Sequence, residues 1–357
     1  MQPFAGRAAV AGIGMTALTR ESGRTEEDLA AEACRAACAD AGIASREVDA
    51  VLSYHMNDSA PAVRVARALG IERLGWHNDI AGGGTQAASI LGDAAMLIQA
   101  RLARNILIYR ALNGRSGTRM NTAPTGISTG ISTYGLAGPI PLFAMAATRY
   151  LHDTGLAAEH LHAVVAQSRQ NAAANPRALR RDPLTLDAYL ARPYVCTPLR
   201  TVDCCQETDG ACALLVSAVL DGPRVHAAVR GGGPGCSSMD RAPDAGTIFS
   251  AYVAPMVWDA SGMRPADVDV ALLYDAYSWL VPRQLEDFGF AAREELGTYL
   301  MERRHAWVNP HGGLLSEGYV HGLNNAAQAV RELRAGRSVA LVTGFGGSYG
   351  SAALLVR

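Results

Sequence analysis

Short apolar runs rich in β-branched residues alternate with longer Ala-rich segments along this chain, and the alternation restricts it to an α/β architecture. Thr25 stands at the start of the first helical segment and can cap it. The pattern in the first part of the chain predicts strands at 9–13, 48–54, 105–110 and 211–218, and helices at 26–41 and 86–102.

The order of elements recurs in the second part of the chain, which indicates two similar halves at 1–222 and 223–357. Between about 113 and 200 a Gly-, Ser- and Thr-rich stretch followed by two helical segments, 141–154 and 157–174, reads as an insertion in the first half. The later segments predict strands at 224–230, 268–273, 339–343 and 352–356, and helices at 247–261 (with a kink at Pro255) and 325–333.

Composition excludes several classes of protein. The 357 residues carry a formal net charge of -1, so no basic surface for nucleic acid is expected. No apolar run is long enough to span a bilayer, and the N-terminus lacks the order of a signal peptide, which favours the cytoplasm. Seven scattered cysteines, an odd number, are typical of reduced thiols, and we predict no metal site.

Several blocks resemble a known superfamily. YGLAGPIPLFAMAATRYLHDTG and PLRTVDCCQETDGACALLVS resemble the thiolase half of sterol-carrier-protein-X-type (lipid-transfer-protein) thiolases, and NPHGGLLSEGYVHGLNNAAQAV and TGFGGSYGSAALL resemble the last two thiolase active-site blocks. The resemblance covers essentially the whole chain. It implies a thiolase fold, in which two similar halves form a layered αβαβα arrangement with an inserted loop domain, and it implies a homodimer.

The four thiolase motifs all depart from the usual pattern here. Ala81 stands where the nucleophilic cysteine is expected, when Gly84 is matched to the glycine of that motif. Gly344 takes the position of the acid/base cysteine. Tyr274-Asp275-Ala276-Tyr277 replaces Asn-Glu-Ala-Phe, and Tyr319 replaces the histidine of Gly-His-Pro.

Without a thiolate at these positions the usual thiolase chemistry is not available. Paired tyrosines in place of Asn and His make the chain similar to the thiolase-like steroid side-chain-cleaving aldolases. That resemblance implies retro-aldol cleavage of a β-hydroxyacyl-CoA to a ketone and a shorter acyl-CoA. It also implies a small partner with an OB-fold and a zinc ribbon. CoA would enter as part of the substrate, and no cofactor is expected.

The expected roles follow from proton affinity. Tyr319 and Tyr274 form the predicted central pair, because a neutral phenol is a good donor but a poor base at pH 7. His311 or His321 would serve as base or orienting group. Tyr277 and Asp275 complete the predicted catalytic set. Tyr277 stands in place of a packing Phe, and Asp275, at the position of the motif's Glu, can instead support a catalytic residue without touching the substrate.

Backbone donors are also expected to bind the acyl-CoA. Gly83 and Gly84 precede a helix, and Gly346 and Gly347 lie in a glycine run, so their N–H groups can meet a thioester oxygen. Arg177, Arg180 and Arg181 lie in the insertion, where they either contact CoA phosphates or form a solvated patch.

Two other functions remain open from the sequence. A thiolase-like acyltransferase or condensing enzyme would need another nucleophile, such as Cys204 or Cys205, in a block that we expect to be a structural strand region. A degenerate thiolase subunit would bind acyl-CoA without turning it over. Neither the acyl group nor the direction of the reaction can be read from the residues.

Overall fold

The computed structural model describes residues 4, 6–117, 133–136, 138–234 and 242–357. Five strands of the first half form one part of its sheet: β1 (Ala9–Met15), β2 (Ala50–His55), β3 (Trp76–Ala81), β4 (Asn105–Asn113) and β7 (Asp209–Ser217). Their spatial order is β3-β2-β4-β7-β1. β2 runs parallel to β3 and β4, and β7 runs antiparallel to β4 and β1.

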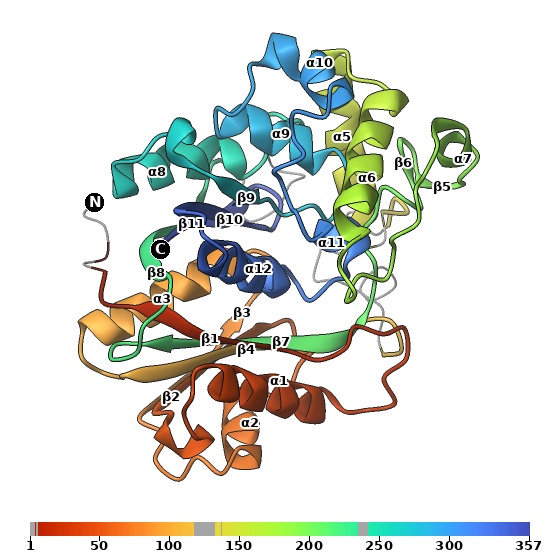
Figure 1. Ribbon diagram of the computed structural model, residues 1–357. Coiled ribbons are helices and arrows are strands. Elements are labelled where there is room, and N and C mark those ends of the chain that lie inside the picture. Colours follow the sequence, from red (N-terminus) through yellow and green to blue (C-terminus); the bar gives the residue numbers. More distant parts are fainter. Residues whose placement is uncertain (1–3, 5, 118–132, 137, 235–241) are drawn as a thin grey trace.

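The second half contributes the other four strands. These are β8 (Arg224–Gly232), β9 (Val270–Leu272), β10 (Val339–Phe345) and β11 (Tyr349–Val356), in the order β8-β11-β10-β9. The two parts of the sheet meet at β1 and β8, where Ala9 pairs with Arg224. Beyond this narrow junction the two groups of strands lie in separate layers of the molecule (Figure 1).

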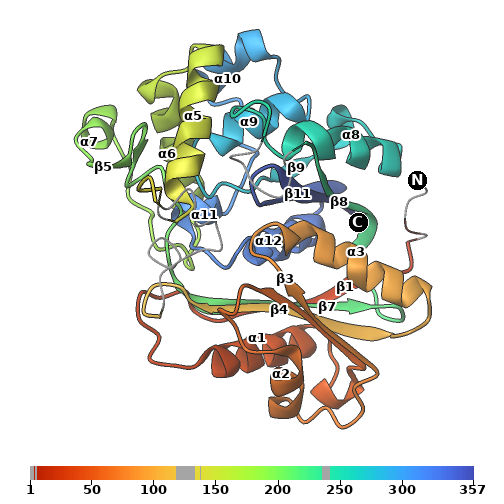
Figure 2. The ribbon, with the colours of Figure 1, turned by 180° about the vertical axis from the view of Figure 1, so that it is seen from behind.

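The helices complete five layers. α1 (Glu26–Asp40) and α2 (Ala62–Ala68) cover the outer face of the first group of strands. α3 (Gln86–Gln99) and α12 (Leu323–Arg334) lie between the two groups, and α8 (Ser250–Ser261) and α9 (Leu280–Asp287) cover the outer face of the second (Figures 1 and 2). Three apolar cores fill the interfaces between helices and strands. This confirms the predicted αβαβα layering.

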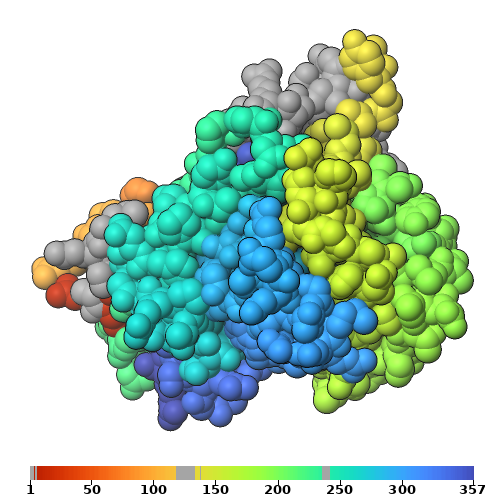
Figure 3. Space-filling model, turned by 90° about the horizontal axis from the view of Figure 1, so that it is seen from above, coloured from red at the N-terminus to blue at the C-terminus, as the bar shows by residue number. Residues whose placement is uncertain are grey.

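The inserted segment packs on the outer side of the second half. It contains α5 (Ile140–Thr154), α6 (Ala158–Ala172), α7 (Leu186–Leu190) and the hairpin β5 (Tyr194–Cys196) and β6 (Leu199–Arg200). Seen from above, α5 and α6 lie beside α9 and α10 (Leu296–Met301) (Figure 3). α11 (Gly313–Ser316) packs under α6.

Most predicted elements are present within a few residues of their expected bounds. Thr25 caps α1 by accepting a hydrogen bond from the Asp28 N–H, and Pro255 lies inside α8. Whether the chain divides into domains at 222 and 223 stays a prediction. Within the described parts of the chain, none of the helices has the length and apolar character needed to cross a bilayer.

Candidate active site

Two phenols from the second half meet at the centre of the site. Tyr274 follows β9, and its N–H donates to Oγ1 of Thr343 on the neighbouring strand (2.8 Å). Tyr319 lies between α11 and α12, where its N–H donates to Oγ1 of Thr208 (3.1 Å) and its carbonyl accepts from the same hydroxyl (2.8 Å). The Tyr274 and Tyr319 hydroxyl oxygens are 2.7 Å apart. The structure thus brings together the two tyrosines that the motifs single out.

Both phenols are neutral at physiological pH. Burial raises the pKa of Tyr274 well above its usual value, and the neighbouring Tyr319 raises it further. Burial likewise raises the pKa of Tyr319 well above its usual value, although the hydrogen bond from Tyr274 lowers it. At pH 7 the pair can therefore donate and relay protons, but neither member stands as a free phenolate.

Glycines leave the room that the Tyr274 phenol occupies. A Cβ atom on Gly84 would overlap the hydroxyl group of Tyr274. A Cβ atom on Gly344 would stand 2.6 Å from the carbonyl oxygen of Gly84 and 2.6 Å from the hydroxyl of Ser351. Ala81 ends β3, and its carbonyl accepts from the Gln86 side chain (3.1 Å). The position matched to the acid/base cysteine thus has no space for a side chain.

The predicted backbone donors differ in their availability. Gly346 already donates its N–H to the carbonyl of Tyr349 (3.1 Å), so this group is not free for a thioester oxygen. The carbonyl of Gly347 accepts the Phe249 N–H. Gly83 lies against the His321 ring, because a Cβ atom there would be 3.3 Å from its Cε1. Gly84 therefore borders the Tyr274 phenol and Gly83 borders the His321 ring, whereas Gly346 forms part of the turn between β10 and β11.

His321 is held by residues that the sequence did not point to. Nε and Nη2 of Arg110 lie 3.2 and 2.8 Å from Nδ1 of His321, and the same guanidinium pairs with Asp58 (2.7 Å). Burial, then Arg110, lowers the pKa of His321 to about 3. Its ring centroid lies 4.9 Å from that of Tyr319. This environment argues against His321 as a general base, the first of its two expected roles.

His311 and Asp275 lie in the buried shell behind the phenols. Nε2 of His311 is 3.1 Å from Oδ1 of Asn325 and 3.6 Å from Oε2 of Glu317, and burial lowers the pKa of the imidazole. Asp275 accepts from the N–H of Leu314 (2.8 Å) at the start of α11. Burial raises the pKa of Asp275 to about 7, although hydrogen bonds from the backbone of Leu314 and Leu315 lower it. Both groups hold the segment that carries Tyr319.

Tyr277 and two cysteines border the same cluster. Tyr277 is buried with its ring 5.1 Å from that of Phe143, so it packs as the Phe of the motif would, and its catalytic role stays a prediction. Cys205 donates its N–H to Ala276 (2.8 Å), and its thiol is close enough to influence the pKa of all three phenols. Cys204 and Cys205 precede β7, so the expected strand begins after them.

The charge state of these thiols bears on the acyltransferase alternative. Burial raises the pKa of Cys204 to about 12 and that of Cys205 well above its usual value, and nearby acidic groups add to both shifts. A nucleophilic cysteine needs a lowered pKa, because the thiolate is the reactive form. Neither thiol therefore meets the requirement for a covalent acyl-enzyme.

An arginine-rich pocket adjoins the cluster through Cys205. It has a volume of about 550 Å³, and its lining includes Arg20, Arg115, Arg169, Arg180, Arg192 and Glu207. Burial lowers the pKa of Arg169 and Arg180, and neighbouring arginines lower it further. The buried Nε of Arg169 has no hydrogen-bond partner among the described residues. Crowded cations of this kind favour an anionic ligand.

Only one of the three arginines named from the sequence lines this pocket. Arg180 does so and donates to Gln206 (3.0 Å). Arg177 instead binds the buried carboxylate of Glu317 (3.1 Å), and Arg181 is exposed. The other lining arginines are distant from one another in sequence, so no local motif predicts them. Arg20 and Arg115 follow β1 and β4, Arg169 lies on α6, and Arg192 follows α7.

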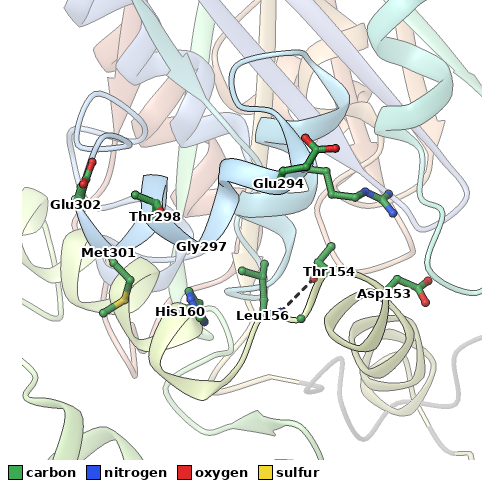
Figure 4. Close-up of a pocket in the computed structure, with 11 residues that line it drawn as sticks. Asp153, Thr154, Leu156, His160, Glu294, Gly297, Thr298, Met301 and Glu302 are labelled. Atoms are coloured by element: carbon green, nitrogen blue, oxygen red, sulfur yellow. Dashed lines mark hydrogen bonds between the residues drawn. The ribbon is translucent and has the colours of Figure 1, made fainter.

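A second pocket, of about 680 Å³, lies on the outer side between the α5–α6 connection and α10. Asp153, Glu294 and Glu302 place carboxylates around it, and His160 and Leu156 form part of its wall (Figure 4). None of its lining residues belongs to the phenol cluster. Its lining has three carboxylates and one arginine, Arg293, a balance that disfavours phosphate groups.

The comparisons with known proteins agree with this geometry. The model of the thiolase C-terminal domain-like family matches residues 236–356. The chain is 36% identical to a 17-hydroxy-3-oxo-4-pregnene-20-carboxyl-CoA lyase of Mycobacterium tuberculosis, covering 96% of this chain and 95% of that protein. It is 35% identical to a steroid side-chain-cleaving aldolase of Thermomonospora curvata, covering 94% and 92%.

Solved structures show the same fold. An Ltp2-ChsH2(DUF35) aldolase superposes with a TM-score of 0.91 at 34% identity, covering 98% of each chain. Human mitochondrial 3-ketoacyl-CoA thiolase superposes with a TM-score of 0.78 at 16% identity, covering 99% of each chain. The chain belongs to the thiolase superfamily, and within it to the family of thiolase-like steroid side-chain-cleaving aldolases.

Proposed function

We propose that this protein is an acyl-CoA carbon–carbon lyase, which cleaves a β-hydroxyacyl-CoA by a retro-aldol reaction to a ketone and a shorter acyl-CoA. The observation that carries the proposal is the hydrogen-bonded pair of neutral phenols, Tyr274 and Tyr319, at 2.7 Å. They lie in blocks where thiolases carry an Asn and a His. The two positions of the thiolase cysteines are occupied by Ala81 and Gly344. Relatives named as a lyase and an aldolase support the same reaction.

The phenol pair suits the proton balance of this reaction. Retro-aldol cleavage removes the proton of the β-hydroxyl, breaks the bond between Cα and Cβ, and places a proton on Cα. One phenol can accept the hydroxyl proton and pass its own proton to the second phenol, while the second phenol gives its proton to Cα of the enolate in the same concerted step. The relay needs no free phenolate, and this agrees with the raised pKa of both residues.

The arginine-rich pocket supports CoA as the carrier of the acyl group. CoA presents phosphates at one end and the thioester at the other, so its site needs cations at some distance from the reacting carbons. Arg169, Arg180 and Arg192 supply the cations, and Cys205 links their pocket to the phenols. The reaction as proposed uses side chains of the protein alone, with CoA as part of the substrate.

We assign a steroid side chain as the acyl group on the names of the two relatives at 35% and 36% identity. The apolar residues around the phenols, including Phe143 and Phe345, are consistent with a bulky apolar substrate, since the Phe345 ring lies 6.0 Å from that of Tyr274. A series of β-hydroxyacyl-CoAs of increasing ring number tests this assignment by kcat/KM.

A homodimer is supported by the exposed edge of the first sheet. Among the strands of the described residues β3 has one neighbour, β2, so no described strand pairs with its other edge. Trp76 on β3 and Met96 and Leu102 nearby are 41%, 52% and 53% exposed. Light scattering of Trp76→Glu/Met96→Glu is expected to show a monomer where the native chain is a dimer. A monomeric native chain would contradict this proposal.

We also propose a partner with an OB-fold and a zinc ribbon, which is supported by the solved neighbour named Ltp2-ChsH2(DUF35) aldolase. A cytoplasmic location is a second proposal, supported by the six free cysteines of the described residues. Turnover measured with and without a purified partner of this class tests the first point. Unchanged turnover together with no complex on gel filtration would argue against a partner.

The function itself is tested with a branched β-hydroxyacyl-CoA and the purified chain, alone and with the partner. Chromatography is expected to show a ketone and a shorter CoA ester in equal amounts, and intact-mass spectrometry is expected to show no acyl adduct. A trapped adduct would favour the acyltransferase alternative. Tight binding of the substrate without product in either preparation would favour a non-catalytic subunit.

A further inference from the structure

The imidazole of His321 is anchored on one side only. Arg110, on β4, directs two N–H donors at Nδ1, at 3.2 and 2.8 Å. Asp58 pairs with the same Nη2 at 2.7 Å, and Nη1 of Arg110 donates to the carbonyl of Ala111 (2.9 Å). Although burial opposes it, Arg110 holds the pKa of Asp58 below its usual range, so this carboxylate stays charged.

This anchoring decides where the ring proton of His321 sits. A guanidinium has only donors, so Nδ1 must be the acceptor and the neutral ring must carry its proton on Nε2. A second proton on Nδ1 would point at two N–H groups of a cation, and burial disfavours the charged ring as well. His321 is therefore a neutral imidazole with a single N–H donor.

The donor is left without a partner. Nε2 of His321 is fully buried and has no hydrogen-bond partner among the residues that the structure describes, although buried donors are nearly always paired. The ring lies between the Tyr319 ring and Gly83, whose added Cβ would stand 3.8 Å from Nε2. Gly83 is followed by Gly84, which borders the Tyr274 hydroxyl. The unpaired N–H thus belongs to the same small region as the phenols.

The backbone at His321 is also held in an unusual state. Its φ is +46°, in the left-handed region that residues with side chains rarely adopt, and Tyr54 donates its hydroxyl to the His321 carbonyl (3.0 Å). Such conformations persist where the surroundings impose them, often at functional sites. Two separate contacts, on the ring and on the main chain, fix the direction of the N–H.

We infer that Nε2–H of His321 donates a hydrogen bond to the thioester oxygen of the substrate as it becomes an enolate, and that Arg110 is the positioning residue that sets the tautomer. This inference rests on the proposed lyase function. A neutral donor aimed at a developing oxyanion stabilises the transition state without a permanent charge in the pocket. It assigns His321 a role as donor, separate from the proton relay of the two phenols.

The tautomer is measured directly by NMR on protein labelled with ¹⁵N-histidine. We expect His321 of the native chain to show a protonated Nε2 and an unprotonated Nδ1 from pH 5 to 8. Arg110→Met should give a mixture of tautomers, and Arg110→Lys should restore part of the native signal. A proton on Nδ1 in the native chain, or an unchanged spectrum in Arg110→Met, would overturn the inference.

Ligand binding isolates the hydrogen bond. A short saturated acyl-CoA carries the thioester oxygen, and the matching S-alkyl-CoA thioether lacks it. Calorimetry should show about tenfold tighter binding of the thioester by the native chain. His321→Ala should remove this preference, while His305→Gln, at another buried histidine that lies outside the phenol cluster, should keep it.

A second variant, His321→Gln, controls for misfolding of His321→Ala. Two further outcomes distinguish failure of the His321 assignment from failure of the lyase function. His321→Gln keeps an N–H donor in a neutral side chain, so it should retain more of the preference than His321→Ala. Equal affinity of the native chain for both compounds, in a preparation that does release a ketone, would overturn the His321 assignment alone. A thioester preference without any ketone formation would support the assignment and contradict the lyase function.

Discussion

The space beside Gly84 is filled by the phenol of Tyr274, so that a Cβ atom at this glycine would overlap the hydroxyl group. A Cβ atom on Gly344, the glycine at the position of the acid/base cysteine, would in turn stand 2.6 Å from the carbonyl oxygen of Gly84. The phenol of Tyr274 and the closed position at Gly344 therefore meet at Gly84. The two hydroxyl groups at the centre of the site lie 2.7 Å apart, within hydrogen-bond distance of each other.

The first prediction concerns this close contact. Gly84→Ala should displace the Tyr274 ring, lower kcat by at least about a hundredfold, and destabilise the fold by about 1–3 kcal/mol through overpacking. Gly231→Ala is the control, because its Cβ meets only the flexible end of Met256 at 3.1 Å. Steady-state kinetics and urea unfolding measure the two effects. Native turnover in Gly84→Ala would show that the phenol position is not critical.

The second prediction uses the buried carboxyl of Asp275. Its folded pKa of about 7 lies above the unfolded value of about 3.9, so the stability it contributes is present below pH 4 and is lost as the pH rises through 7. Relative to Asp275→Asn, the native chain should lose about 4 kcal/mol of unfolding free energy between pH 4 and 8.

Urea unfolding of both proteins across this pH range measures the difference. Asn at 275 keeps one oxygen for the Leu314 N–H and removes the ionisation, so it isolates the titration. Parallel stability curves for the two proteins would mean that Asp275 titrates with an ordinary pKa.

The third prediction concerns the arginine-rich pocket. Arg169→Met should raise KM for the acyl-CoA about tenfold with little change in kcat, because it removes a charge-assisted contact far from the reacting carbons. Added salt should raise KM of the native chain more than that of the variant. Arg304→Met, at a half-exposed arginine paired with Glu302, is the matched control. A drop in kcat at constant KM would place Arg169 nearer the chemistry.

How far the sequence predicts the site depends on how local its signals are. Tyr274 and Tyr319 stand in recognisable blocks, and their expected proximity agrees with the structure. Arg110 and Asp58 carry no motif, because Arg110 reaches His321 over 211 positions of the chain and reads as one polar residue in an apolar strand. Tertiary contacts of this kind are invisible to periodicity.

The missed elements have similar causes. β3 reads Trp-His-Asn-Asp-Ile-Ala, without alternation, since it is an exposed edge strand whose polarity hides it. α9 contains Pro282 in its first turn, where proline is tolerated, but the residue marks a break when only the sequence is considered. The prediction that the Gly346 N–H is free was wrong, because this group donates to the Tyr349 carbonyl in the β10–β11 turn.

The proposed mechanism depends most directly on the phenol pair, and the decisive measurement is the rate of ketone release from a branched β-hydroxyacyl-CoA. Tyr319→Phe and Tyr274→Phe should each lower kcat by about 10²–10⁴-fold with the fold intact by circular dichroism. Tyr150→Phe, at a buried tyrosine that binds Glu286 at 3.1 Å, should retain native turnover. Near-native ketone release by both Tyr319→Phe and Tyr274→Phe would contradict the proposed mechanism.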